Sequence, residues 1–176
     1  MEVLNIMMIL ALICIVLLTG VDQFIKVWAI DNLKNSNSIE FIKFGNLKVI
    51  DLTYLENDGA VFGSFGGQRV MLVAVSIIMV LACGYCLFKY GKKSKLFATC
   101  LTLIISGGIG NGIDRIFRGG RVVDYIEVKL FNFAIFNFAD ICVVIGVFLL
   151  AIYVFFIDAK TNCIFMDKKN ITEDKK

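Results

Sequence analysis

Four long apolar runs constrain this sequence more than any other feature. They cover about residues 4–21, 70–88, 96–113 and 138–157. Each is close to the ~20 residues that a helix needs to cross a bilayer core of ~30 Å. The chain is 59% hydrophobic, 19% of its residues are charged, and its mean hydropathy is +0.82. Because this composition is typical of membrane proteins, we expect a membrane α-helical fold with four transmembrane helices.

The first apolar run allows two readings, a cleaved signal peptide or a retained helix. No basic residue precedes it and no A-x-A pattern follows it, although a signal peptide normally has both. We therefore expect a retained transmembrane helix. Asp22 and Lys26 follow the run at a spacing of four residues, which puts them on one helical face. This spacing predicts an interfacial ion pair that also braces a functional site.

The placement of lysines predicts the orientation in the membrane. The short loop 89–95 carries four lysines, and the tail 161–176 is also rich in lysine. Short basic loops stay in the cytoplasm, so both termini and the tail are expected there. The outer segments also carry Lys and Arg, so the orientation depends mainly on the lysine loop. This topology gathers five polar residues at the outer membrane face: Asp22, Asn57, Asp114, Asp124 and Asp140.

The polar segment 31–69 is expected to form an extracytoplasmic cap. Residues 41–44 and 47–54 flank the turn residues Gly45 and Asn46, a pattern that predicts a β-hairpin. The stretch 57–63 that follows is either a simple turn or a wall of the site where a substrate approaches closely. The aromatic residues of the cap could cover a substrate or anchor the protein at the interface; they are Phe41, Phe44, Phe62 and Phe65.

Carboxylates stand at the ends of the apolar segments around the third and fourth runs. An ionisable group at mid-bilayer costs ~2.5–3.5 kcal/mol on insertion scales, so such groups tend to be functional. Asp124 and Asp140 flank one outer loop and form the natural pair. Two neighbouring carboxylates share a proton, so that one can activate water while the other protonates a scissile carbonyl or a leaving amine.

The other polar residues of this region are expected to support the pair. Asp114 stands next to Arg115, and we expect these two residues to form a structural ion pair. Asn111 and Asn137 can hydrogen-bond carboxylates or a peptide backbone without adding charge.

Several classes of protein are excluded or disfavoured by composition. The chain has no histidine, which excludes Ser-His, Cys-His and HExxH chemistry. It shows no basic patch of the kind that binds nucleic acid. Five of the six cysteines lie in apolar runs, where a thiol behaves as a small hydrophobic group. We therefore expect no metal, no cofactor and no nucleic-acid partner.

The residue types alone leave two other functions open. Intramembrane aspartates also serve as proton or ion relays, so a small proton-coupled carrier or channel using Asp114 and Asp124 is the main alternative. A Ser-Lys peptidase using Ser64 and Lys26 is a more remote one. It is disfavoured because Lys26 is better explained as the brace beside Asp22.

Five motifs then stand in one order along the chain. They are DQFIK at 22–26, NDGAVFG at 57–63, GGIGNGIDR at 107–115, VVDYI at 122–126 and FNFAD at 136–140. Any one of them is weak, but five in order across four apolar runs are specific. The set closely resembles the bacterial lipoprotein signal peptidases, also called signal peptidase II. The resemblance covers nearly the whole chain except the tail.

The resemblance implies an intramembrane aspartyl endopeptidase of the bacterial cell membrane. Its four transmembrane helices and small extracytoplasmic β-sheet would form one peptidase domain over residues 1–160. Such enzymes remove signal peptides from prolipoproteins by cleaving before a diacylglyceryl-modified cysteine. Membrane lipid and peptide antibiotics of the globomycin type are further partners that the resemblance implies.

Carried over by motif, Asp124 and Asp140 correspond to the catalytic dyad of the family. The positions around the dyad are matched by Asp22, Lys26, Asn57, Gly107, Gly110, Asn111, Asp114, Arg115 and Asn137. The family usually has a proline shortly before the FN-x-AD motif, whereas this chain has Ala134 in that region.

Overall fold

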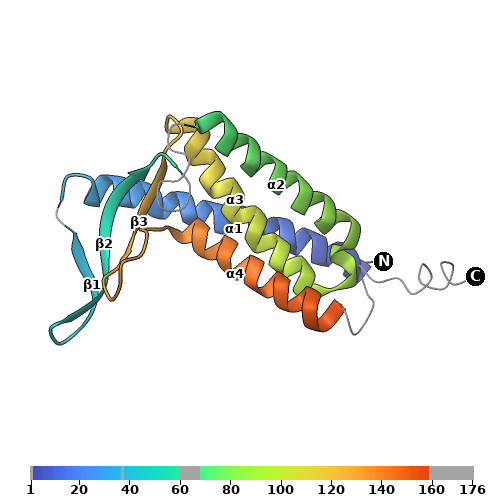
Figure 1. The fold of residues 1–176 in the computed structure, drawn as a ribbon. Coiled ribbons are helices and arrows are strands. Elements are labelled where there is room, and N and C mark those ends of the chain that lie inside the picture. Colours follow the sequence, from blue (N-terminus) through green and yellow to red (C-terminus); the bar gives the residue numbers. More distant parts are fainter. Residues whose placement is uncertain (1, 37, 60–67, 159–176) are drawn as a thin grey trace, which may run out of the picture.

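The computed structural model describes residues 2–36, 38–59 and 68–158 (Figure 1). The elements follow in the order α1 (Glu2–Leu33), β1 (Ile39–Phe44), β2 (Leu47–Asn57), α2 (Arg69–Tyr90), η2 (Gly91–Lys93), α3 (Lys95–Phe117), β3 (Val122–Val128), α4 (Phe138–Ile152) and η3 (Tyr153–Asp158). The four long helices form a bundle, and the strands lie together at one end of it (Figure 1). Four helices in the described part are long and apolar enough to span a membrane. The expected membrane α-helical fold is confirmed.

Two of the helices extend beyond the apolar runs that predicted them. α1 continues past Val21 to Leu33, and α3 continues past Ile113 to Phe117. The charged residues at these points do not end the helices, because the side chains of Asp22 and Asp114 are buried inside the bundle. The last turns of α1 then pack on the sheet, in a core of buried residues made by Ala29, Leu33, Val123 and Tyr125.

The small sheet has three antiparallel strands in the order β1-β2-β3. The predicted hairpin is confirmed, with Gly45 in the turn at a φ of 60°, a left-handed conformation that glycine adopts without strain. β2 is longer than the predicted strand and reaches Asn57. β3 comes from the outer loop between α3 and α4, for which the residues themselves predicted no strand. Its register places Leu55 opposite Asp124, so the sheet carries one candidate aspartate directly.

The central helix of the bundle is α3, which contacts α1, α2 and α4. In its most apolar window 61% of the residues are buried, against 22% or less in the other three spans. Glycines allow the close approach of α4. A Cβ atom at Gly107 would overlap the backbone oxygen of Ala139, and one at Gly146 would meet Ile104 Cγ1 at 2.8 Å.

The cysteines in the described part of the chain are free thiols. Cys100 and Cys142 are buried, while Cys14 on α1 is exposed. Cys163 and the predicted cytoplasmic tail lie outside the described residues. The expectation that the thiols act only as packing groups stays a prediction.

A pair of glycine substitutions on α3 tests the packing of α3 on α4. Gly107→Ala should lower the free energy of unfolding by ~1–3 kcal/mol, because the added methyl group meets fixed backbone. Gly112→Ala is the matched control, because nothing lies within 4 Å of its added Cβ. Thermal unfolding of both variants in detergent measures the difference. Equal melting temperatures would contradict the close α3–α4 contact.

Candidate active site

The strand β3 and the first turn of α4 bring Asp124 and Asp140 together around a single asparagine. Asn137 Nδ2 donates to Asp124 Oδ1 at 2.6 Å, and the backbone N–H of Asn137 donates to Asp140 Oδ2 at 3.1 Å. Asn137 is the N-cap of α4, and its Oδ1 accepts the backbone N–H of Asp140 at 3.0 Å. This reciprocal pair is a capping box. The same hydrogen bonds that begin α4 therefore fix the two carboxylates relative to each other.

Each of the four carboxylate oxygens accepts a hydrogen bond. Asn57 Nδ2 donates to Asp124 Oδ2 at 3.0 Å, and Asn111 Nδ2 donates to Asp140 Oδ1 at 2.7 Å. Asn137 supplies the other two donors, as described above. Amide donors stabilise a carboxylate without carrying a charge of their own. The amides therefore fix the positions of the two carboxylates but do not neutralise their negative charge.

Burial and proximity shift the protonation of this pair. The side chain of Asp124 is 2% exposed. Burial, followed by the charge of Asp140, raises the pKa of Asp124 from its ordinary value of 3.8 to about 6, although hydrogen bonds from Asn57 and Asn137 act in the opposite direction. Both effects disfavour a second negative charge at this point. Asp124 therefore keeps its proton up to about pH 6, well above the range in which an ordinary aspartic acid loses it.

A buried charge network lies next to the pair of aspartates and helps to hold it in place. Lys26 Nζ lies 2.9 Å from Asp22 Oδ2 and 3.0 Å from Asp114 Oδ2, and all three side chains are 1% exposed or less. Lys26 also donates to Asn111 Oδ1 at 2.8 Å. Since Asn111 donates to Asp140, the ammonium group fixes the orientation of the amide that holds the candidate dyad. The predicted ion pair of Asp22 and Lys26 is confirmed.

Asp22 also links α1 to the start of α4. Its Oδ1 accepts the backbone N–H of Ala139 at 3.0 Å. Gly110 is what permits this approach, because a Cβ at that position would meet Asp22 Oδ2 at 2.5 Å. The two glycines singled out by sequence, Gly107 and Gly110, therefore act by making room for α4 and for Asp22.

The predicted ion pair between Asp114 and Arg115 is wrong. Among the described residues, Asp114 forms ion pairs with Lys26 and with Arg118 Nε, the latter at 3.0 Å. Adjacent helical residues project about 100° apart, whereas residues four apart share a face. Arg115 instead donates to the backbone oxygen of Gly59 at 3.4 Å. It interacts electrostatically with Asp140 and Asp124 first, and with Asp114 after them. Arg115 thus acts mainly on the candidate dyad.

Three residues of the site escaped the sequence reasoning. Gln23 Nε2 donates to Asp22, Gly110 O and Asp114, so it ties α1 to α3. Tyr125 Oη accepts the backbone N–H of Phe138 at 3.1 Å and so helps to position the start of α4. Gln23 and Tyr125 stand inside the motifs DQFIK and VVDYI, which was the available signal. Arg118 had no such signal, because it stands beyond the motif of α3.

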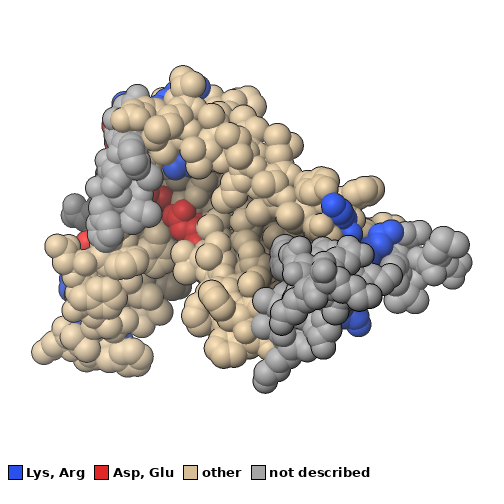
Figure 2. Space-filling model, turned by 45° about the vertical axis from the view of Figure 1, so that its right-hand side comes forward, with Lys and Arg blue, Asp and Glu red and all other residues tan. Residues whose placement is uncertain are grey.

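Acidic side chains are visible at the bottom of a hollow between the sheet end and the helices (Figure 2). Within the described ranges, no group of three or more His, Cys, Asp or Glu side chains has an arrangement that could hold a metal ion. Ser64, Phe62, Phe65 and residues 60–63 of the NDGAVFG motif lie outside the described residues.

The fold and the site define a multi-pass membrane protein that carries a buried pair of aspartates at one end of a four-helix bundle. Residues 13–156 match the family model described as Signal peptidase (SPase) II. The chain therefore belongs to the signal peptidase II family, and the resemblance seen in the motifs is confirmed.

Named relatives and a solved structure agree with this membership. A lipoprotein signal peptidase of Clostridium acetobutylicum is 41% identical over 145 residues, which cover 81% of this chain and 91% of the relative. One of Clostridioides difficile is 37% identical over 154 residues, covering 87% of this chain and 99% of the relative. A solved bacterial membrane enzyme superposes with a TM-score of 0.73 at 29% identity, covering 86% of this chain and 90% of that one.

Replacement of the buried lysine tests the charge network. Lys26→Met should lower the free energy of unfolding by ~3–5 kcal/mol, because it leaves Asp22 and Asp114 buried without their shared cation. Lys43→Met is the matched control. Lys43 pairs with Glu40 at the same 2.9 Å, but it is 60% exposed, and an exposed pair contributes ~1 kcal/mol or less. Thermal unfolding that ranks the two variants equally would contradict the network.

The pKa of Asp124 predicts a specific pH dependence of stability. Because the folded-state pKa is raised, this group contributes stability that is present below about pH 4 and is lost as the pH rises through about 6. The loss amounts to ~3 kcal/mol for a shift of about two units. Thermal unfolding should therefore favour Asp124→Asn over the natural protein increasingly between about pH 4 and about pH 7.5.

The control for this measurement is Asp31→Asn, which changes an exposed carboxylate in the last turns of α1. Its melting temperature should follow that of the natural protein at every pH. Parallel curves for the natural protein and Asp124→Asn would show that Asp124 ionises normally and would overturn the prediction.

Proposed function

We propose that the protein is an aspartyl endopeptidase that removes signal peptides from prolipoproteins by cleaving before a diacylglyceryl-modified cysteine. One observation carries the aspartyl mechanism. Asn137 donates to both Asp124 and Asp140, and burial together with the charge of Asp140 raises the pKa of Asp124 to about 6. This is the condition under which two carboxylates divide the acid and base roles. The substrate follows from the family and from the names of its members.

The surroundings of the two aspartates assign their roles. Asp140 lies in the first turn of α4, where the helix dipole favours a negative charge. Its oxygens accept hydrogen bonds from Asn111 and Asn137, and it interacts with the charge of Arg115. Asp124 lies on the buried part of β3, where burial raises its pKa to about 6. We therefore assign the acid role to Asp124 and the base role to Asp140.

The reaction then proceeds in two steps, each with two proton transfers. Asp140 takes a proton from water as the oxygen of that water attacks the scissile carbonyl, and Asp124 donates its proton to the carbonyl oxygen. The tetrahedral intermediate collapses when the leaving amine takes the proton from Asp140 and the new carboxylic acid returns one to Asp124. The pair ends in its starting state. The reaction uses the two aspartates, the substrate and one water molecule.

The substrate is expected to meet the dyad at the membrane surface. Its two acyl chains stay in the bilayer, so the bond next to the modified cysteine stays near the ends of the spanning helices, where both aspartates lie. Phe41 and Phe44 on β1 are 63% and 72% exposed. They suit either role predicted for them, covering the peptide or anchoring the sheet at the interface. Peptide antibiotics of the globomycin type are expected to compete for this site.

The active site is proposed to face the outside of the cell membrane, with both termini in the cytoplasm. The lysine loop between α2 and α3 and the N-terminal end of α1 lie at the end of the bundle opposite the sheet (Figure 1). Short basic loops remain in the cytoplasm, so the sheet and the dyad lie outside. A reporter fused at Lys93 should score inside, and an outside score would reverse the placement of the site.

The carrier or channel alternative has no support in the geometry. It needs Asp114 as a proton relay, but both oxygens of Asp114 are occupied. Oδ2 accepts from Lys26 and from the backbone N–H of Val123, and Oδ1 accepts from Arg118 and Gln23. The Ser-Lys peptidase alternative needs an accessible amine, whereas Lys26 is fully buried among its partners.

Substitution of the two aspartates tests the mechanism. Asp124→Asn and Asp140→Asn should each abolish cleavage about as fully as the double change, because residues that act as a unit are not additive. The measurement is the single-turnover rate on a diacylglyceryl prolipoprotein, with folding checked for each variant. Asp31→Asn serves as the control and should keep full activity.

Two outcomes would change the assignment. Substantial cleavage by either single variant would show that the dyad is not the catalytic unit. Asp114→Asn should mainly lower the yield of folded protein, because Asp114 pairs with Lys26 and Arg118. A well-folded but inactive Asp114→Asn would place Asp114 in the catalytic group.

A further inference from the structure

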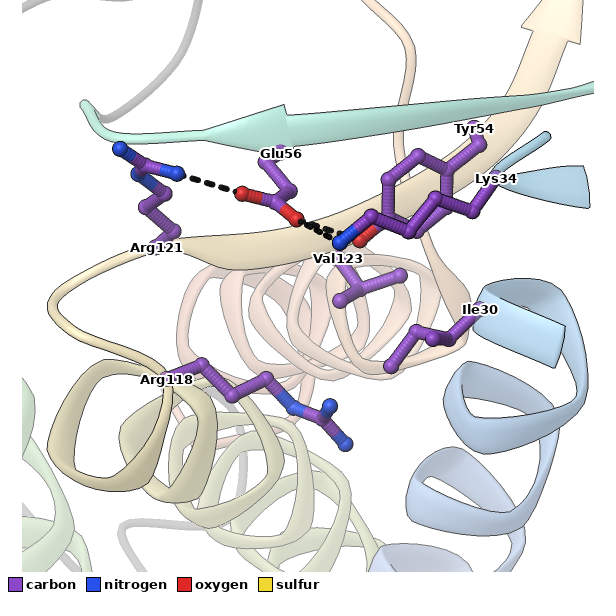
Figure 3. A pocket seen from close by; sticks show the side chains of 7 residues that line it. All are labelled: Ile30, Lys34, Tyr54, Glu56, Arg118, Arg121 and Val123. Atoms are coloured by element: carbon purple, nitrogen blue, oxygen red, sulfur yellow. Dashed lines mark hydrogen bonds and ion pairs between the residues drawn. The ribbon is translucent and has the colours of Figure 1, made fainter.

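A second hollow of the molecule lies beside the candidate active site and shares Arg118 with it. It is a cavity of about 260 Å³ between the outer ends of α1 and α3 and the strands β2 and β3 (Figure 3). Its lining residues are Ile30, Lys34, Tyr54, Glu56, Arg118, Arg121 and Val123. None of the functions considered so far uses this cavity.

The charged groups of the cavity do not balance. Three cations line it, and Glu56 is its one carboxylate. Glu56 already accepts from Arg121 at 2.6 Å, from Lys34 at 3.0 Å and from Tyr54 Oη at 2.7 Å. These donors lower the pKa of Glu56 to about 2, so it is ionised, and one negative charge serves two cations. Arg121 also interacts electrostatically with Asp58, but among the residues that line the cavity the cations outnumber the carboxylates.

Arg118 brings the third cation to the opposite wall. Its Nε pairs with Asp114 Oδ1 at 3.0 Å, and its guanidinium reaches toward the space beside Ile30 and Val123 (Figure 3). Among the described residues, no partner is found for its two terminal nitrogens. A guanidinium presents its N–H groups as a planar fork that fits two oxygens of a phosphate. The guanidinium of Arg118 is thus held at Nε, and its terminal nitrogens remain available to a ligand.

The position of the cavity relative to the membrane narrows the choice of anion. Arg118 directly follows α3, four residues beyond Asp114, and the ends of spanning helices reach the lipid headgroups. Lys34 directly follows α1, whose last turns pack on the sheet at the same end of the bundle. Basic residues at this level attract anionic lipids. Ile30 and Val123 supply an apolar wall on the bundle side.

We propose that this cavity binds the phosphate of an anionic phospholipid headgroup, held by Arg118 on one side and by Arg121 and Lys34 on the other. The apolar wall contacts the carbon atoms next to the phosphate. Because Arg118 also holds Asp114, which pairs with Lys26, a bound headgroup is joined through two ion pairs to the network beneath the candidate dyad.

The test is a titration of the full-length protein in a maltoside detergent, followed by the phosphorus NMR linewidth of the ligand. One arm uses short-chain phosphatidylglycerol, a second uses short-chain phosphatidylcholine, and a third uses inorganic phosphate. Saturable broadening is expected with phosphatidylglycerol. The other two should bind at least about fivefold more weakly, since each cation near a lipid surface is worth about a factor of five for an anionic lipid.

Two kinds of variant test whether binding occurs in this cavity. One removes cations from its wall and the other removes its carboxylate. The double change Arg121→Gln with Lys34→Gln should weaken phosphatidylglycerol binding about tenfold or more, because it removes two cations of the wall. Glu56→Gln should strengthen it several-fold, because it frees the same two cations. Lys48→Gln is the matched control. Lys48 also lies on β2 and pairs with a glutamate at 2.6 Å, but it lies outside the cavity.

The results expected for a lipid site differ from those expected for a general charge effect or for a phosphate site. A gain with Glu56→Gln, a loss with the double change and no effect of Lys48→Gln support the site. Equal weakening by the double change and by Lys48→Gln would reduce the effect to general charge and overturn it, as would weaker binding by Glu56→Gln. Inorganic phosphate that binds as tightly, with the same variant pattern, would assign the cavity to soluble phosphate and overturn the lipid assignment.

Discussion

The buried ammonium group of Lys26 is the interaction on which the rest of the site depends. It lies between two carboxylates from two helices, Asp22 on α1 and Asp114 on α3, and it also donates to Asn111. Buried charges are tolerated only when their partners are well placed and their remaining hydrogen bonds are made. The bundle meets this condition, because Gln23, Ala139 N–H and Val123 N–H donate further hydrogen bonds to the oxygens of the two aspartates.

The first turn of α4 connects this charge network to the two candidate aspartates. Asn137 caps the helix and contacts both candidate aspartates, so a shift of the helix start would move Asp140 relative to Asp124. Three elements fix that start from different sides. Asp22 accepts from Ala139 on α4, Tyr125 of β3 accepts from Phe138, and Gly107 allows α3 to approach Ala139. A mechanism that divides one proton between two carboxylates requires this kind of fixed separation.

Sequence reasoning recovered much of the fold and the residue set of the site, but not its pairings. The four spans, the hairpin and the ion pair of Asp22 with Lys26 were predicted and are confirmed. The resemblance to signal peptidase II is confirmed as well. The pairing of Asp114 with Arg115 was wrong, and β3 and the residues Gln23, Tyr125 and Arg118 were missed. The catalytic roles of Asp124 and Asp140 remain a proposal that the geometry supports.

Features that depend on neighbouring residues could be predicted from the sequence, whereas features that depend on contacts between distant segments could not. The sequence by itself determined the spans, because hydropathy over about 20 residues is a local property. It also determined the hairpin turn and the polar residues available to a site. Only the tertiary structure decided which partner each buried charge takes, because Lys26 and Asn111 lie 85 residues apart and meet only where α1 packs on α3. The same packing kept α1 helical past Val21 and joined the ends of α1 and α3 with the sheet into a cationic cavity, a feature that no single segment contains.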